Sequence, residues 1–143
     1  MALLRSVVLL AIALLQSGPT TAPTTAPSRT VWDGVYSSAQ VARGKTAYAN
    51  LCARCHGETL LGNDDAVPLV GGEFVKRWEG KSIGSLVDLT QKDMPTDGPG
   101  KLTRRQSTDV TVYLLNANGF PAGQNEMPPE LETLNAILIQ PKR

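Results

Sequence analysis

The hydrophobic and polar positions of residues 38–52 repeat with the period of an α-helix. Val41, Tyr48 and Leu51 fall near one face of such a helix. Gly44 lies on the same face, four residues before Tyr48, where the missing side chain permits a close helix crossing. The segment is therefore predicted to be an amphipathic helix that packs against another part of the chain.

Shorter helical patterns follow, separated by segments rich in glycine and proline. Residues 74–78 favour a helical turn, and residues 82–91 favour a second helix with a weaker pattern. Two prolines and two glycines exclude regular structure from residues 94–100. Thr103 begins a capping-box pattern that opens a last helix, and Gly119 is a plausible stop for it.

Three to five short helices without a convincing strand predict a small all-α domain. Aromatic residues make up only 5% of the sequence, so the side chains alone form a thin core. Residues from about 122 to 143 are predicted to be an extended tail, in which Leu131, Leu134 and Ile137 can pack back onto the helices. We therefore expect a domain that needs additional apolar bulk to fold well.

The first thirty residues have a different character. Residues 1–17 combine the basic Arg5 with the apolar run 7–15, which is the arrangement of a secretory signal peptide. A membrane span needs about 20 apolar residues, so export followed by cleavage is expected, with an uncleaved anchor as the alternative. Residues 18–30 contain Thr-Thr-Ala-Pro twice, a composition that predicts a solvated linker. The folded domain is therefore expected to span residues 31–143.

The charge of the chain excludes one broad class of function. Its 14 lysine and arginine residues face 13 aspartate and glutamate residues, and Arg5 and Arg29 both precede residue 31. A nearly neutral domain lacks the basic surface of nucleic-acid-binding proteins. No nucleic-acid partner is expected.

The pentapeptide Cys52-Ala-Arg-Cys55-His56 is the attachment signature of a c-type haem. One turn of chain presents both sulfurs along one edge of a porphyrin, where each can add to a vinyl group as a thioether. His56 then lies beneath the ring, where its imidazole can ligate the iron. Thioether formation takes place outside the cytoplasm, in agreement with a signal peptide, and the porphyrin would supply the missing apolar bulk.

Other chemistries fit the same residues less well. Zinc needs about four ligands, whereas the whole sequence contains two cysteines and one histidine. A thioredoxin-type pair expects a βαβ pattern, and no β-rich run precedes Cys52. A simple disulfide leaves His56 without a role. A thiol redox site and a disulfide remain the alternatives to haem c.

The order of these elements, over roughly residues 35–121, resembles a class I (monohaem) cytochrome c. Gly44 and Tyr48 are similar to the first-helix pair of that family, which crosses the last helix, here at Val110 and Tyr113. Three stretches are also similar to bacterial periplasmic cytochromes c that accompany quinoprotein dehydrogenases: residues 31–36, 94–95 and 117–123. The resemblance implies a small cytochrome c fold wrapped around one covalent haem c.

The resemblance also implies roles for single residues. Pro68, twelve residues after His56, stands where the family's proline carbonyl accepts a hydrogen bond from the ligand imidazole. Met94, in the Met-Pro loop, stands where the family has its second axial ligand. Met127 is also followed by proline and is the rival ligand, but it comes after the last helix. Trp78 either donates its indole N–H to a haem propionate or is a core residue.

The expected function is that of a soluble, periplasmic one-electron carrier rather than an enzyme, with His56 and Met94 as axial ligands. The alternatives are a haem subunit of a larger oxidoreductase complex and a five-coordinate haem that binds gas or peroxide. The expected partners are redox proteins, such as a quinoprotein dehydrogenase or a terminal oxidase. A monomer is expected, with membrane contact only if the signal peptide is retained as an anchor.

Overall fold

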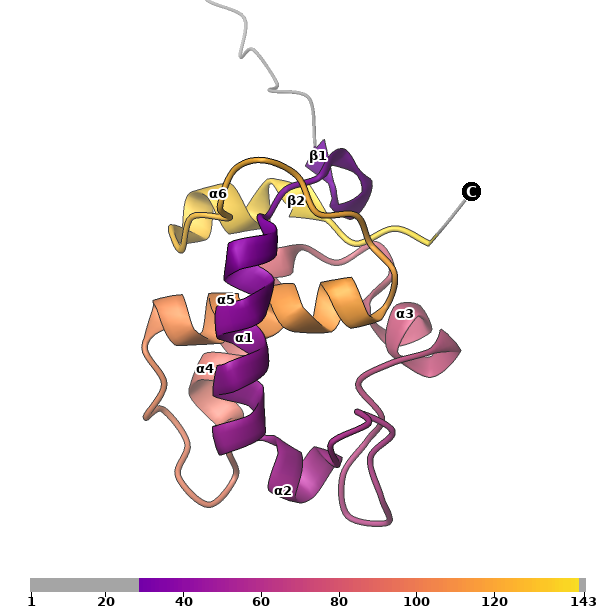
Figure 1. The fold of residues 1–143 in the computed structure, drawn as a ribbon, viewed down its shortest axis with the longest axis vertical. Coiled ribbons are helices and arrows are strands. Elements are labelled where there is room, and N and C mark those ends of the chain that lie inside the picture. Colours follow the sequence, from indigo (N-terminus) through magenta and orange to yellow (C-terminus); the bar gives the residue numbers. More distant parts are fainter. Residues whose placement is uncertain (1–28, 142–143) are drawn as a thin grey trace, which may run out of the picture.

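The computed structural model describes residues 29–141, which form a mostly helical domain (Figure 1). The elements, in chain order, are β1 (Arg29–Thr30), the 3-10 helix η1 (Val31–Asp33), α1 (Ser38–Leu51), α2 (Ala53–His56), α3 (Gly72–Trp78), α4 (Ile83–Asp93), α5 (Arg104–Ala117), α6 (Leu131–Asn135) and β2 (Ile137–Leu138). The prediction of an all-α fold is confirmed, and the single turns α2 and α6 raise the helix count above the expected number. The predicted signal peptide, residues 1–17, lies outside the described residues, as does the linker up to residue 28. None of the described helices is long and apolar enough to cross a bilayer.

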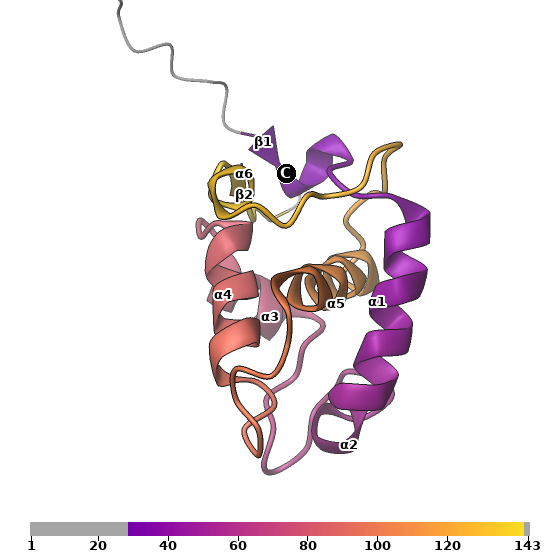
Figure 2. The ribbon, with the colours of Figure 1, turned by 90° about the vertical axis from the view of Figure 1, so that its left-hand side faces the viewer.

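The centre of the fold is the crossing of α1 over α5 (Figure 1). A Cβ atom added to Gly44 would lie 1.9 Å from the carbonyl oxygen of Asp109, so the two backbones meet with no room for a side chain. One turn further on, the rings of Tyr48 and Tyr113 pack with their centroids 5.3 Å apart. The crossing predicted from the sequence is confirmed, and α5 also packs against α4 on its other side (Figure 2).

Side chains from the preceding residues cap the long helices. Ser37 accepts a hydrogen bond from the backbone N–H of Gln40 at the start of α1, and Ser82 caps α4 in the same way. Thr103 and Gln106 form the predicted capping box at the start of α5. These caps satisfy backbone donors that the first helical turn leaves unpaired, which explains why the helices begin there.

The tail after α5 is more ordered than an extended segment. It contains α6 and the strand β2, which pairs in parallel with β1 over Arg29–Ile137 and Thr30–Leu138. The expectation of a domain without strands is therefore corrected by this short sheet. Its partners lie more than one hundred positions apart, so no local pattern could indicate the pairing.

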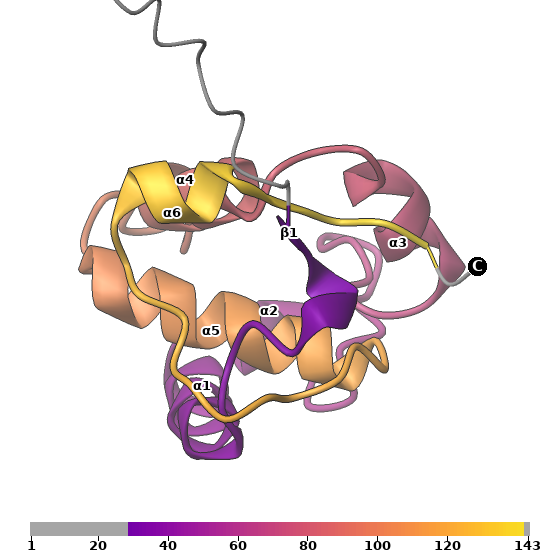
Figure 3. The same cartoon turned by 90° about the horizontal axis from the view of Figure 1, so that it is seen from above.

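The three apolar tail residues have different environments. Leu134 and Ile137 are buried, as predicted. Leu131 is 44% exposed, so the prediction that it packs onto the domain is wrong. Leu131 is the first residue of α6, whereas Leu134 lies near the end of the helix, and α6 lies over α4 (Figure 3).

A buried glutamine joins the tail to α1. Gln40 is 1% exposed, and its side-chain amide donates to the carbonyl oxygen of Met127 at 3.0 Å and accepts from the Met127 N–H at 2.8 Å. The same amide donates to Asp109 on α5 at 3.0 Å. The strands β1 and β2 and the helix α6 lie at the end of the molecule opposite α2 (Figures 1 and 2).

Candidate haem-attachment site

The Cys52–His56 pentapeptide folds as one turn at the end of α1. Cys52 leaves the helical conformation (φ −123°, ψ −34°) and ends α1, and α2 begins at the next residue. The N–H groups of Cys55 and His56 then donate to the carbonyl oxygen of Cys52 at 3.1 and 3.0 Å. Both cysteines and the histidine are therefore presented from a single turn, as the sequence predicted.

Both thiols of the motif are free, and their surroundings differ. Cys52 is half-buried and Cys55 is exposed. Burial, helped by the neighbouring Cys55, raises the pKa of the Cys52 thiol to about 11. A redox-active cysteine normally has a lowered pKa, because the thiolate is the reactive species. The Cys52 environment therefore argues against a thioredoxin-type site.

One hydrogen bond orients the imidazole of His56. Its Nδ1 lies 2.9 Å from the carbonyl oxygen of Val67. Since a carbonyl only accepts, Nδ1 of the neutral ring carries the proton, which leaves the Nε2 lone pair to bind a metal. The acceptor is the carbonyl of Val67, one residue before Pro68. It is not the Pro68 carbonyl that the resemblance implied. Pro68 disfavours a helical conformation in the residue before it, which helps to turn the Val67 carbonyl toward the ring.

The loop after His56 is fastened to the motif by further hydrogen bonds. Tyr48 donates its hydroxyl to the Gly57 carbonyl at 2.7 Å, and Asn63 donates its side-chain amide to the Cys55 carbonyl at 2.9 Å. Gly62 has a φ of +70°, and a Cβ there would lie 2.1 Å from the Ala66 carbonyl oxygen. The sequence analysis missed Asn63, although an Asn-Asp pair after glycine is a recognisable turn signal.

The two methionine candidates lie in different places. Met94 is half-buried at the C-terminal end of α4, where it opens the loop that leads to α5. Asp97 of this loop forms an ion pair with Arg54 of the attachment motif. Met127 is held by Gln40, twelve residues before Cys52 on α1, which corresponds to about 18 Å of helix. The structure therefore brings the Met94 loop, and not Met127, to the motif.

Trp78 ends α3 and is only 7% exposed, in contact with the main core. The ammonium group of Lys81 lies 5.1 Å from the centroid of its ring, a cation–π distance. This environment agrees with the core interpretation of Trp78. Its contact with a haem propionate stays a prediction.

The site suits a haem better than a bare metal ion. Within residues 29–141, no three His, Cys, Asp or Glu side chains gather where they could hold an ion. A haem brings its own equatorial nitrogens, so the protein needs to provide only axial ligands and attachment points. The free Nε2 of His56 and the two free thiols on one turn fit that requirement.

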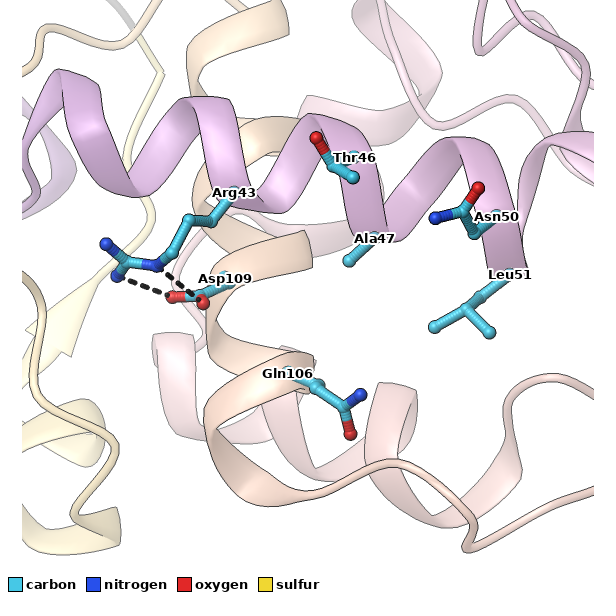
Figure 4. Close-up of a pocket in the computed structure, with 7 residues that line it drawn as sticks. All are labelled: Arg43, Thr46, Ala47, Asn50, Leu51, Gln106 and Asp109. Carbon is cyan, nitrogen blue, oxygen red and sulfur yellow. Dashed lines mark hydrogen bonds and ion pairs between the residues drawn. The ribbon is translucent and has the colours of Figure 1, made fainter.

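An open groove of about 470 Å³ lies along the α1–α5 crossing (Figure 4). At one end of it, Arg43 donates to both carboxylate oxygens of Asp109, at 3.2 and 3.3 Å. The remaining lining residues are Thr46, Ala47, Asn50, Leu51 and Gln106. The groove contains no residue of the attachment motif, and its ion pair joins α1 to α5.

Comparison with known proteins supports this assignment. Residues 39–114 match the family described as cytochrome c oxidase, cbb3-type, subunit III. The fold is similar to a chain in the crystal structure of the sulfane dehydrogenase SoxCD from Paracoccus pantotrophus, with a TM-score of 0.50 and 21% identity over 87% of this chain and 68% of that one. No curated protein matches the chain significantly. Because the family match covers more than half of the sequence, the chain belongs to this cytochrome c family, whose function is haem-based electron transfer.

Proposed function

We propose that the protein is a periplasmic one-electron carrier with one haem c, attached through Cys52 and Cys55 and ligated by His56 and Met94. The observation that carries the proposal is the single turn that presents both thiols together with an imidazole whose Nε2 is free. When bound, the haem supplies an iron that exchanges one electron. The folded domain, which includes β1 at Arg29–Thr30, would be preceded by a signal peptide and a linker.

Each residue of the site has a defined part in this function. The His56 Nδ1–H bond to Val67 holds the ring in one orientation and makes Nε2 more basic. The hydrogen bonds from Tyr48 and Asn63 hold the backbone around the motif. If His56 and Met94 both ligate the iron, no ligand position would be left for a substrate, which is why we propose a carrier rather than an enzyme.

The axial role of Met94 is tested with a matched pair of variants. Met94→Leu should abolish the sulfur-to-iron absorption band of the oxidised protein, lower the reduction potential and allow carbon monoxide to bind the reduced form, because a soft donor is lost. Met127→Leu should leave all three properties unchanged, since leucine nearly conserves the volume of a buried methionine. Absorption spectra and redox titration provide the measurements.

Two other results would change the interpretation. Loss of the band in the Met127 variant alone would contradict the ligand assignment. A wild-type protein that is high-spin and binds carbon monoxide readily would favour the five-coordinate, gas- or peroxide-binding alternative.

Covalent attachment and export are tested together by the intact mass of the protein purified from the periplasmic fraction. The denatured chain should carry the mass of one haem and should begin between about Ser17 and Ser28, because the apolar run is too short to span a bilayer. Cys52→Ser or Cys55→Ser should leave one thioether or a poorly accumulating protein. Haem that extracts into acidic organic solvent would refute attachment, and a chain that retains Met1 in the membrane pellet would refute cleavage.

A haem subunit within a larger oxidoreductase is the second candidate. It is favoured by the family, which is described as an oxidase subunit, and by the similar fold in a dehydrogenase structure. We propose a redox protein partner in either case, with a terminal oxidase or a quinoprotein dehydrogenase as candidates. Size-exclusion chromatography of the native haem-containing fraction separates the two: a free carrier elutes at the size of one chain, and a subunit co-elutes with its complex.

A further inference from the structure

An ion pair joins the attachment motif to the Met94 loop. Arg54 occupies a position between the two cysteines, and its guanidinium contacts the carboxylate of Asp97. Both side chains are 57% exposed. Asp97 lies three residues after Met94, in a turn that is closed by a hydrogen bond of 2.9 Å from the Gly98 N–H to the Pro95 carbonyl.

The loop itself has little regular structure to hold it. Between the end of α4 and the start of α5 the chain contains two prolines and two glycines and forms only turns and bends. Of the ion pairs formed within residues 29–141, the Arg54–Asp97 pair is the one that joins this loop to the motif. A movement that takes Met94 away from the attachment segment would therefore have to break it.

We propose that Arg54 and Asp97 are positioning residues that together form a latch, which holds the Met94 loop against the attachment segment and opposes the departure of Met94 from the iron. This inference rests on the proposed ligation by Met94. Arg54 sits on a turn that two thioethers would anchor, whereas Asp97 sits on the part of the chain that must move. The latch thus ties the Met94 loop to a turn that the two thioethers would fix.

The latch is tested by the affinity of the oxidised holoprotein for imidazole, which competes with Met94 for the sixth position. At low ionic strength, Arg54→Gln and Asp97→Asn should each tighten imidazole binding about two- to fivefold, which is the range expected from an exposed ion pair. The double variant should bind no more tightly than either single variant, and the swap R54D/D97R should restore part of the wild-type value. At high salt the wild type should approach the variants, because exposed charges are screened.

The control is Arg105→Gln, which removes an exposed arginine of α5 that pairs with Glu126 at 3.6 Å, so that its ion pair includes no residue of the motif or of the loop. Its imidazole affinity should equal that of the wild type. Denaturant unfolding of each variant is measured alongside, and the free energy of unfolding of the Arg54 and Asp97 variants should fall by no more than the amount that corresponds to the change in imidazole affinity, because both measurements report the loss of one exposed ion pair. A loss of unfolding free energy well above the amount that corresponds to the change in imidazole affinity would indicate a general disturbance of the fold and would overturn the latch.

Failure of the latch can be distinguished from failure of the ligand assignment. If Met94→Leu opens the site to imidazole while the Arg54 and Asp97 variants behave as wild type, the latch is refuted and the carrier stands. If Met94→Leu leaves imidazole binding unchanged, Met94 is not the sixth ligand, and both proposals fall.

Discussion

Leu134→Ala should lower the free energy of unfolding by about 2–5 kcal/mol, whereas Leu131→Ala should change it by about 0.5 kcal/mol or less. The two leucines lie on the same short helix, α6. Leu134 is fully buried in the main core, so its truncation leaves a cavity, while Leu131 is 44% exposed and loses few contacts. Urea unfolding of the holoprotein, followed by circular dichroism, measures both changes.

This comparison also tests whether the tail belongs to the fold. The family match ends at residue 114, yet Leu134, Ile137 and Ile139 belong to the same buried cluster as the helices. A Leu134→Ala variant as stable as the wild type would mean that α6 does not dock on α4. Equal losses for both leucines would mean that α6 docks in a different orientation.

Gly44→Ala should lower the free energy of unfolding by about 3 kcal/mol, at the upper end of the range for overpacking. The added Cβ would lie 1.9 Å from the Asp109 carbonyl oxygen and 3.0 Å from the Tyr113 Cβ. Backbone atoms cannot move aside as a flexible side chain does, so α1 and α5 must separate. Because α1 carries the attachment motif at its end, the yield of haem-containing protein should fall as well.

Gly72→Ala is the matched control for this substitution. Gly72 is the first residue of α3, and an added Cβ there meets no atom within 4 Å. Alanine favours helix over glycine, so this variant should be as stable as the wild type or up to about 1 kcal/mol more stable. Denaturant unfolding of both variants provides the test, and a Gly44→Ala protein with wild-type stability would contradict the close crossing.

Features that depend on neighbouring residues could be predicted from the sequence. The helix over residues 38–52 and the capping box at Thr103 both appear in the structure close to their predicted bounds. The single turn of the attachment motif was also correct, because its hydrogen bonds join residues three or four positions apart. The crossing at Gly44 could be predicted because glycine lowers helix stability, so a glycine on the apolar face of a helix indicates that another backbone approaches closely there.

Polar residues with distant partners were harder to interpret. Gln40 looks like a solvated helix residue, yet it is buried because Met127 and Asp109 satisfy its amide. Arg54 stands at a variable position of the motif, and only the loop folded against it provides its partner, Asp97. A side chain alone does not show whether a hydrogen-bonding partner will come from far along the chain.

Residue types at short spacing were enough to indicate the helical class, the chemistry of the attachment motif and its place at the end of the first helix. The folded loop was needed to show that the carbonyl of Val67, rather than that of Pro68, accepts from His56, since a shift of one residue in a loop changes no sequence pattern. The fold also shows that Met127 lies beside Gln40, far along α1 from Cys52. These contacts depend on how distant segments meet, and that geometry is specified by the packing of the whole domain.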